Sequence, residues 1–118
     1  MSDKVEIIAR LVHEAVRAYQ IVLSESPSAA WDQARDWERS PTMAGVRCRI
    51  DNPNAPASRQ HDQWMTERVG AGWKLGSVKD ATLKIHPCLI PHAMLSETER
   101  RKDQLFAVVV RALIDPIA

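Results

Sequence analysis

Residues 61–103 read HDQWMTERVGAGWKLGSVKDATLKIHPCLIPHAMLSETERRKD, and the rest of the chain is interpreted around this stretch. Gly70 and Gly72 are predicted to end a helix, because glycine takes backbone angles that residues with a Cβ avoid. Trp73 therefore follows on a glycine-flanked turn. Residues 73–79 are predicted to form a short extended or hairpin segment. The whole stretch predicts a helix, a turn with loops, and a second helix.

Two long amphipathic helices are predicted at the two ends of the chain. Residues 3–24 carry apolar side chains at steps of three and four residues, the spacing of one helical face. This face comprises Val5, Ile8, Val12, Ala15, Tyr19 and Val22. The final helix starts at Ser96, because Ser96 and Glu99 have the spacing of a capping box. Its predicted core face comprises Leu105, Val108, Val109, Ala112 and Leu113.

A third helix is predicted over residues 42–51, opened by Ser40 and Pro41. Proline is tolerated in the first turn of a helix, where its missing N–H costs least. Arg49, like Arg47, is predicted to point away from the inner face of this helix. That inner face comprises Met43, Val46 and Ile50. The preceding residues, 27–40, are predicted to form a short helix and a bend.

A fourth helix is predicted over residues 57–69, after a turn-rich linker at 52–56. Three- and four-residue spacing places side chains of this helix on adjoining faces. They are His61, Trp64, Met65 and Arg68. The linker is too short, and the halves on either side too small, to separate two domains. The chain is therefore predicted to be one all-α domain over residues 1–118.

Composition limits the classes of function. The chain has 118 residues and a formal net charge of +1, which argues against a broad phosphate-binding surface for nucleic acid. No apolar run approaches the roughly 20 residues of a membrane span. The charged start does not resemble a secretory signal, so Cys48 and Cys88 are expected to be reduced thiols in a cytoplasm.

Candidate catalytic and metal-binding groups are few. His86, Cys88 and His92 lie close together in sequence, but their spacing lacks the paired short spacers of a zinc site. A Cys88–His86 nucleophile pair has no third group to orient it, so Cys88 is interpreted as a small buried residue. Asp80 is interpreted as a helix cap and Asp103 as a salt-bridge partner. We therefore expect no enzyme activity, no bound metal and no cofactor.

The order of motifs in the central stretch resembles the RyR domain, the repeated module of ryanodine-receptor channels. The motifs are His-x-x-Trp from His61, Gly-Trp-x-x-Gly from Gly72, and Lys-x-His-Pro-x-Leu-x-Pro from Lys84. The resemblance is strongest over residues 57–113. Residues 1–56 are similar to the leading helices of single-copy bacterial and phage members. Leu75 and His92 depart from the pattern, which often has aromatic residues at these two positions.

The resemblance implies a helical fold and binding of an adenine-nucleotide or ADP-ribose-like molecule, in the cytoplasm of a bacterium or of a phage host. Trp73 would stack the base, and His86 would fix the loop. The anion-facing groups would be Arg68, Lys74, Lys79 and Lys84. Trp64 is either a further ligand contact or a core residue. In the channel such a site is built from two repeats, so here a partner chain or the leading half, through Trp31, Trp37 and Arg47, would complete it.

A plain interaction module is the alternative. In that case the tryptophans and the edge at residues 91–94 would pack against another protein or a second copy of the chain. The lysines would then be a solvated rim. The two hypotheses differ most clearly in one feature, namely whether the indole of Trp73 faces a hollow at the surface or is buried.

Overall fold

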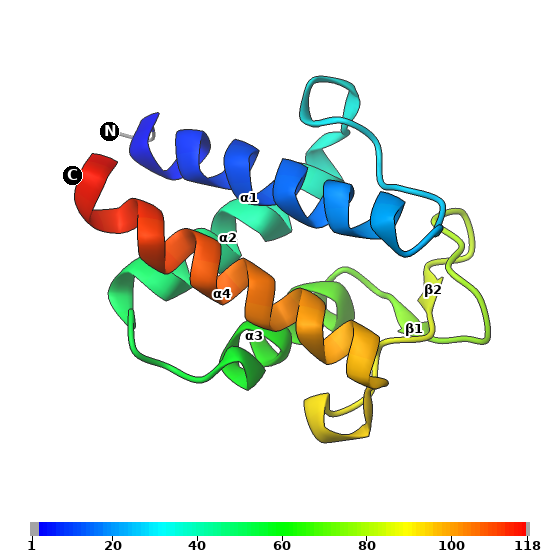
Figure 1. The fold of residues 1–118 in the computed structure, drawn as a ribbon. Coiled ribbons are helices and arrows are strands. Elements are labelled where there is room, and N and C mark those ends of the chain that lie inside the picture. Colours follow the sequence, from blue (N-terminus) through cyan, green and yellow to red (C-terminus); the bar gives the residue numbers. More distant parts are fainter. Residues whose placement is uncertain (1–2, 118) are drawn as a thin grey trace.

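The chain folds as a mostly helical single domain, as predicted (Figure 1). The computed structural model describes residues 3–117, and the surroundings of side chains from 4 to 114. The helices are α1 (Asp3–Val22), α2 (Asp36–Asp51), α3 (Ala57–Gly70) and α4 (Glu97–Ile117). The short elements are the 3-10 helices η1 (Trp31–Gln33) and η2 (His92–Met94) and the strands β1 (Lys74–Leu75) and β2 (Ile85–His86). Within residues 3–117 no helix is both long enough and apolar enough to cross a membrane.

The four helices enclose an apolar core at one end of the molecule. The first turns of α1 and the last turns of α4 lie side by side there, and the two helices diverge toward the side where β1 and β2 lie (Figure 1). The buried core residues are Ile8, Ala9, Val12, Trp31, Val46 and Val110. Burial of such side chains is the main force that holds the helices together. Toward the opposite end of the bundle the buried apolar side chains belong to the segment between α3 and α4, namely Trp73, Leu89 and Leu95.

The apolar face predicted for α4 is partly wrong. Val108 is exposed and Ala112 is exposed, whereas Val110 is fully buried. Val108, Val109 and Val110 are consecutive, so a helical face with three- and four-residue spacing can include any of them. The sequence alone therefore does not show which of these valines faces the core. In α1 the face is correct from Val5 to Val12, but Val22 at its end is exposed.

Helix α2 begins at Asp36 and not at Thr42, so Pro41 lies inside it and not at its start. The orientation predicted for Arg49 is also wrong, because this side chain is buried. Its guanidinium donates to the carbonyls of Ala55 and Pro56. Arg49 therefore supplies hydrogen bonds to carbonyls of the irregular linker backbone. Met43, Val46 and Ile50 pack in the core as predicted.

The short extended segment predicted after Trp73 is confirmed as β1, which is two residues long and pairs in parallel. Of the two predicted forms, extended segment or hairpin, the hairpin is not the one observed. Lys74 pairs with Ile85 and Leu75 with His86. Gly72 supplies the turn with a φ of +91°. Between the strands, the Asp80 carboxylate accepts hydrogen bonds from two backbone N–H groups, which confirms its role as a cap. This pairing fixes the position of His86 next to α3.

Candidate functional site

A cleft of about 690 Å³ opens where α1 and α4 diverge. Its walls come from α1, α2, α3, the segments 25–28 and 86–88, and the first turns of α4. The charged side chains in its lining are Glu25, Glu38, Arg68, Lys79, Glu99, Lys102 and Asp103. A second cavity, of about 450 Å³, lies beside it against Trp37, Arg68, Trp73 and Lys84. The cleft has the size of clefts that bind small molecules.

Arg68, on α3, lines both the cleft and the second cavity. Its guanidinium carbon lies 5.4 Å from the ring centre of Trp37, 5.7 Å from that of Trp64 and 5.0 Å from that of Trp73. Its Nη1 donates a hydrogen bond of 3.1 Å to the carbonyl of Trp37. That carbonyl has no helical partner, because Pro41, four residues later, has no N–H. Arg68 thus satisfies the acceptor that Pro41 leaves free, which explains how α2 tolerates an internal proline.

The charge of Arg68 has no close partner. Among the side chains of residues 4–114 no carboxylate oxygen lies within 4.0 Å of its guanidinium, and Glu38 and Glu67 act on it only from longer range. Burial lowers the pKa of Arg68 from its usual value. The indole faces stabilise the cation in part. The Nε of Arg68 is buried without a hydrogen-bond partner, whereas Nη2 is not among the fully buried unpaired atoms. Arg68 is therefore a half-buried positive charge whose Nη2 donors remain for a ligand.

The expectation that Trp73 presents an open stacking face is wrong. Only 6% of the residue is exposed, and its ring packs against Trp37 at a centroid distance of 5.7 Å. Trp64 is half-buried and lines the cleft, although His61 stacks on it at 5.4 Å. Trp73 is therefore a core residue that supports Arg68, and the indoles nearer to the cleft are those of Trp37 and Trp64.

The three predicted lysines do not form one group. Lys79 lines the cleft. Lys84 lines the second cavity, and its Nζ donates a 2.9 Å hydrogen bond to the carbonyl of Ala71. Lys74 is exposed on β1 and lines neither. Of the predicted anion-facing set, the structure brings together Arg68 and Lys79 at the cleft.

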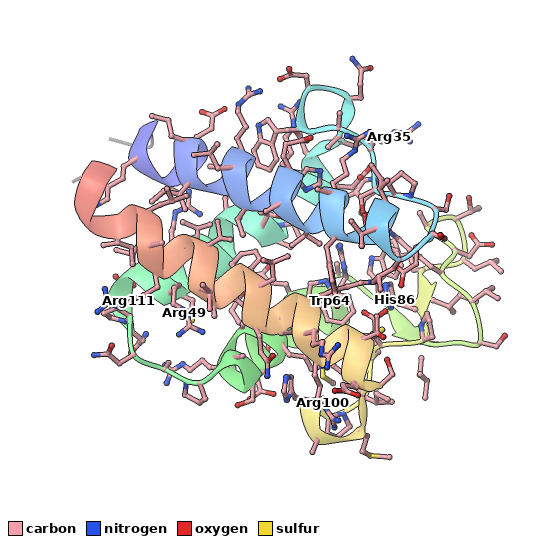
Figure 2. All side chains as sticks on the ribbon, in the orientation of Figure 1. Arg35, Arg49, Trp64, His86, Arg100 and Arg111 are labelled. Atoms are coloured by element: carbon pink, nitrogen blue, oxygen red, sulfur yellow. The ribbon has the colours of Figure 1, made fainter. Side chains whose placement is uncertain are left out.

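His86 lies at the end of β2, in the wall of the cleft and next to Trp64. The two rings meet edge to face with centroids 5.0 Å apart (Figure 2). The Nδ1 of His86 accepts a 3.0 Å hydrogen bond from the backbone N–H of Cys88, so the imidazole fixes the loop as the resemblance implied. Burial, together with the nearby charges of Lys79 and Arg68, lowers the pKa of His86 to about 4.

The opposite wall of the cleft contains an ion pair that the sequence patterns did not indicate. Lys102 on α4 lies 2.6 Å from Glu25, in the loop after α1, and 3.0 Å from Glu99. Cys88 is only half-buried and not fully buried as predicted. Burial and the neighbouring carboxylate of Glu99 raise the pKa of its thiol to about 12, which disfavours the reactive thiolate. Glu99, Lys102 and Asp103 have helical spacing, which was a usable signal. Nothing in the sequence connected them with Glu25.

Asp103 lies between two histidines at the floor of the cleft. Its Oδ2 is 3.7 Å from Nδ1 of His61 and 3.6 Å from Nε2 of His92. The Nε2 of His61 donates to the carbonyl of Ile90 at 2.7 Å, so Nδ1 of a neutral ring is an acceptor that faces the carboxyl oxygen. Among residues 3–117 no group of three or more His, Cys, Asp or Glu side chains is arranged to hold a metal ion.

The leading half of the chain contributes to the cleft through Trp37, as one of the expected arrangements required. Trp31 instead belongs to the apolar core, and Arg47 is exposed outside the cleft. The family model for the RyR domain matches residues 52–114. The chain belongs to the RyR domain family. The matched residues supply α3, β2 and the start of α4, whereas α1 and α2 supply the remaining walls. The cleft of this RyR domain therefore lies between the family module and the helices that precede it.

Proposed function

We propose that this RyR domain is a non-catalytic module that binds a small nucleotide-type ligand in the cleft. The volume of about 690 Å³ accommodates such a molecule. The lining combines the indoles of Trp37 and Trp64 with donors for a phosphate or a carboxylate. Aromatic rings beside cationic groups are the usual means by which proteins bind a planar base that carries an anion. The inferred ligand is of the adenine-nucleotide or ADP-ribose type.

The observation that carries this proposal is the unpaired charge of Arg68. A cation that is partly removed from water, and that has no carboxylate within 4.0 Å among the side chains of residues 4–114, is stabilised by an incoming anion. The hydrogen bond to the Trp37 carbonyl and the surrounding indoles hold the guanidinium in place before any ligand binds. A ligand therefore meets a donor that has already lost its side-chain freedom, which favours binding.

The substitution Arg68→Gln tests the proposal. Wild-type protein should gain about 2.7 kcal/mol of stability at a ligand concentration one hundred times the dissociation constant. Thermal-shift and calorimetric titrations with ATP and with ADP-ribose measure this effect. Arg68→Gln should weaken binding about tenfold or more, since a hydrogen bond to a charged group is lost. Arg47→Gln, which removes an exposed arginine outside the cleft, is the matched control and should bind as wild type does. Equal binding by both variants would contradict the proposal.

A second candidate function, a protein-interaction module, is favoured by a different observation. Leu75, Val78 and Leu83, in the segment from β1 to β2, are exposed by 59%, 59% and 67% respectively. Several exposed apolar side chains in one segment are a feature of surfaces that pack against a partner. If neither ATP nor ADP-ribose stabilises the protein, and its mass in solution rises with concentration, the interaction module is the better interpretation.

A further inference from the structure

The tautomer of His86 is determined by its backbone contact. A backbone N–H can only donate, so the 3.0 Å bond from the Cys88 amide requires a lone pair on Nδ1 of His86. A neutral imidazole carries one proton, which must then be on Nε2. His86 is therefore a ring with one acceptor that is already used and one N–H donor that remains.

The remaining donor is free and accessible. No group within residues 3–117 forms a hydrogen bond with Nε2 of His86, and this atom is not among the fully buried unpaired ones. The residue lines the cleft. Because its pKa is lowered to about 4, the ring stays neutral throughout the physiological range. His86 thus presents a constant N–H donor to whatever enters the cleft.

Two further donors line the cleft from different elements. Arg68 comes from α3 and Lys79 from the loop between the strands, and both are close enough to His86 to act on its charge. On the other wall, the carboxylates of Glu25 and Glu99 are already bonded to Lys102. This side of the cleft therefore offers three sources of donors without a bonded carboxylate.

We propose that Arg68, Lys79 and the Nε2–H of His86 together bind an oxyanion of the ligand, either a phosphate or a carboxylate oxygen. This inference rests on the proposed function and adds the place and the manner of anion binding. A neutral donor beside two cations selects a group that is only an acceptor. A ligand amine at this position is repelled by both cations. Since His86 does not change charge, its contribution is the same at pH 6 and at pH 8, whereas an ordinary histidine would lose its positive charge over this interval.

Two substitutions distinguish the contributions of the two ring nitrogens of His86. In His86→Asn the amide oxygen occupies the place of Nδ1 and keeps the bond from Cys88, but the Nε2 donor is lost. In His86→Gln the amide nitrogen occupies the place of Nε2 and keeps the donor. We expect His86→Asn to weaken binding of ADP-ribose by about tenfold and His86→Gln by less, in calorimetric titrations at pH 7. Thermal unfolding of both variants without ligand shows whether each is folded.

Adenosine is the matched probe, because it has the same base as ADP-ribose and no oxyanion. Its affinity should be equal in wild type and in His86→Asn, and lower than that of ADP-ribose. If His86→Asn binds ADP-ribose like wild type, or loses adenosine equally, this inference fails while the proposed function stands. If the wild type binds neither ATP nor ADP-ribose, both the proposed function and this inference fail.

Nitrogen-15 NMR of the histidine rings is a check that requires no ligand. A proton on Nδ1 of His86, or titration of this ring above pH 6, would overturn the assignment of the donor.

Discussion

The two ends of the helical bundle are filled by different kinds of side chain. At the apolar end the fully buried residues of the four α-helices are Ile8, Ala9, Val12, Val46 and Val110. At the cleft end α1 and α4 have diverged, and an ion pair of 2.6 Å between Glu25 and Lys102 connects the two sides. An ion pair holds two elements together without filling the space between them. The cleft lies where α1 and α4 diverge, and its lining combines apolar side chains such as Val16 and Phe106 with charged ones.

Two arginines show what this difference means for function. Arg49, at the apolar end, donates to the carbonyls of Ala55 and Pro56 and so holds the linker. It lies at the opposite end of the molecule from His86 (Figure 2). Arg68, at the cleft end, makes one hydrogen bond to a carbonyl and otherwise contacts indoles. Burial lowers the pKa of both. Of the two, Arg68 lines the cleft of about 690 Å³, so the proposed binding function concerns Arg68 and not Arg49.

The largest expected effect comes from opening the apolar end. Ile8→Ala should lower the free energy of unfolding by about 2–5 kcal/mol, since Ile8 is fully buried and its truncation leaves a cavity. Chemical denaturation measures this change. Ile7→Ala removes a neighbouring side chain that is 47% exposed and should have a much smaller effect. If the two substitutions lower the free energy of unfolding by the same amount, the core is not where the structure places it.

Sequence patterns were sufficient for the existence of the four helices and for the core residues of α1 and α2, but not for α4, where the buried Val110 was not predicted. Val12 and Val46 lie on faces that the three- and four-residue spacing defines, because burial of that face is what stabilises an amphipathic helix. The start of α2 could not be obtained in this way. Pro41 is a helix-breaking signal within its own segment, and the group that compensates for it, Arg68, lies on another helix. Such tertiary contacts override local propensity.

A smaller effect is expected from the turn that positions His86. A Cβ added at Gly76 would lie 2.6 Å from Cβ of Ile85, so either the strand pair or the side chain must shift. We expect Gly76→Ala to cost about 1–3 kcal/mol, as overpacking usually does. Gly70→Ala is the control, because an added Cβ there meets nothing within 4 Å and alanine favours the helix. Moving His86 should also weaken ligand binding in Gly76→Ala, whereas Gly70→Ala should bind normally. Normal binding by both would show that the strand pair does not position the site.

The candidate site was predictable only in part. Arg68 and Trp64 belong to one helix, and their four-residue spacing is by itself enough to place them on adjoining faces. The burial of Trp73 was not predictable, since a glycine-flanked turn can direct an indole either outward or inward. The pairing of Lys102 with Glu25 joins residues that are 77 positions apart, and no local pattern encodes a contact over that distance.

The smallest expected effect concerns Asp103, at the floor of the cleft. Burial and the neighbouring Glu99 raise the pKa of Asp103 from 3.8 to about 7, although Lys102 opposes this. The folded protein thus binds a proton more tightly than the unfolded chain does, so this carboxyl makes unfolding easier as pH rises from about 4 to about 7. Asp103→Asn removes the titration. Since 21% of the Asp103 side chain is exposed and water offsets part of the cost of ionisation, we expect the variant to be more stable than wild type at pH 8 by about 1 kcal/mol. The difference should vanish near pH 4. Urea unfolding at both pH values measures this difference in the free energy of unfolding.

A variant less stable than wild type at pH 8 would mean that the carboxylate is ionised and paired with His61 or His92. The cleft end would then contain one more ion pair than we infer.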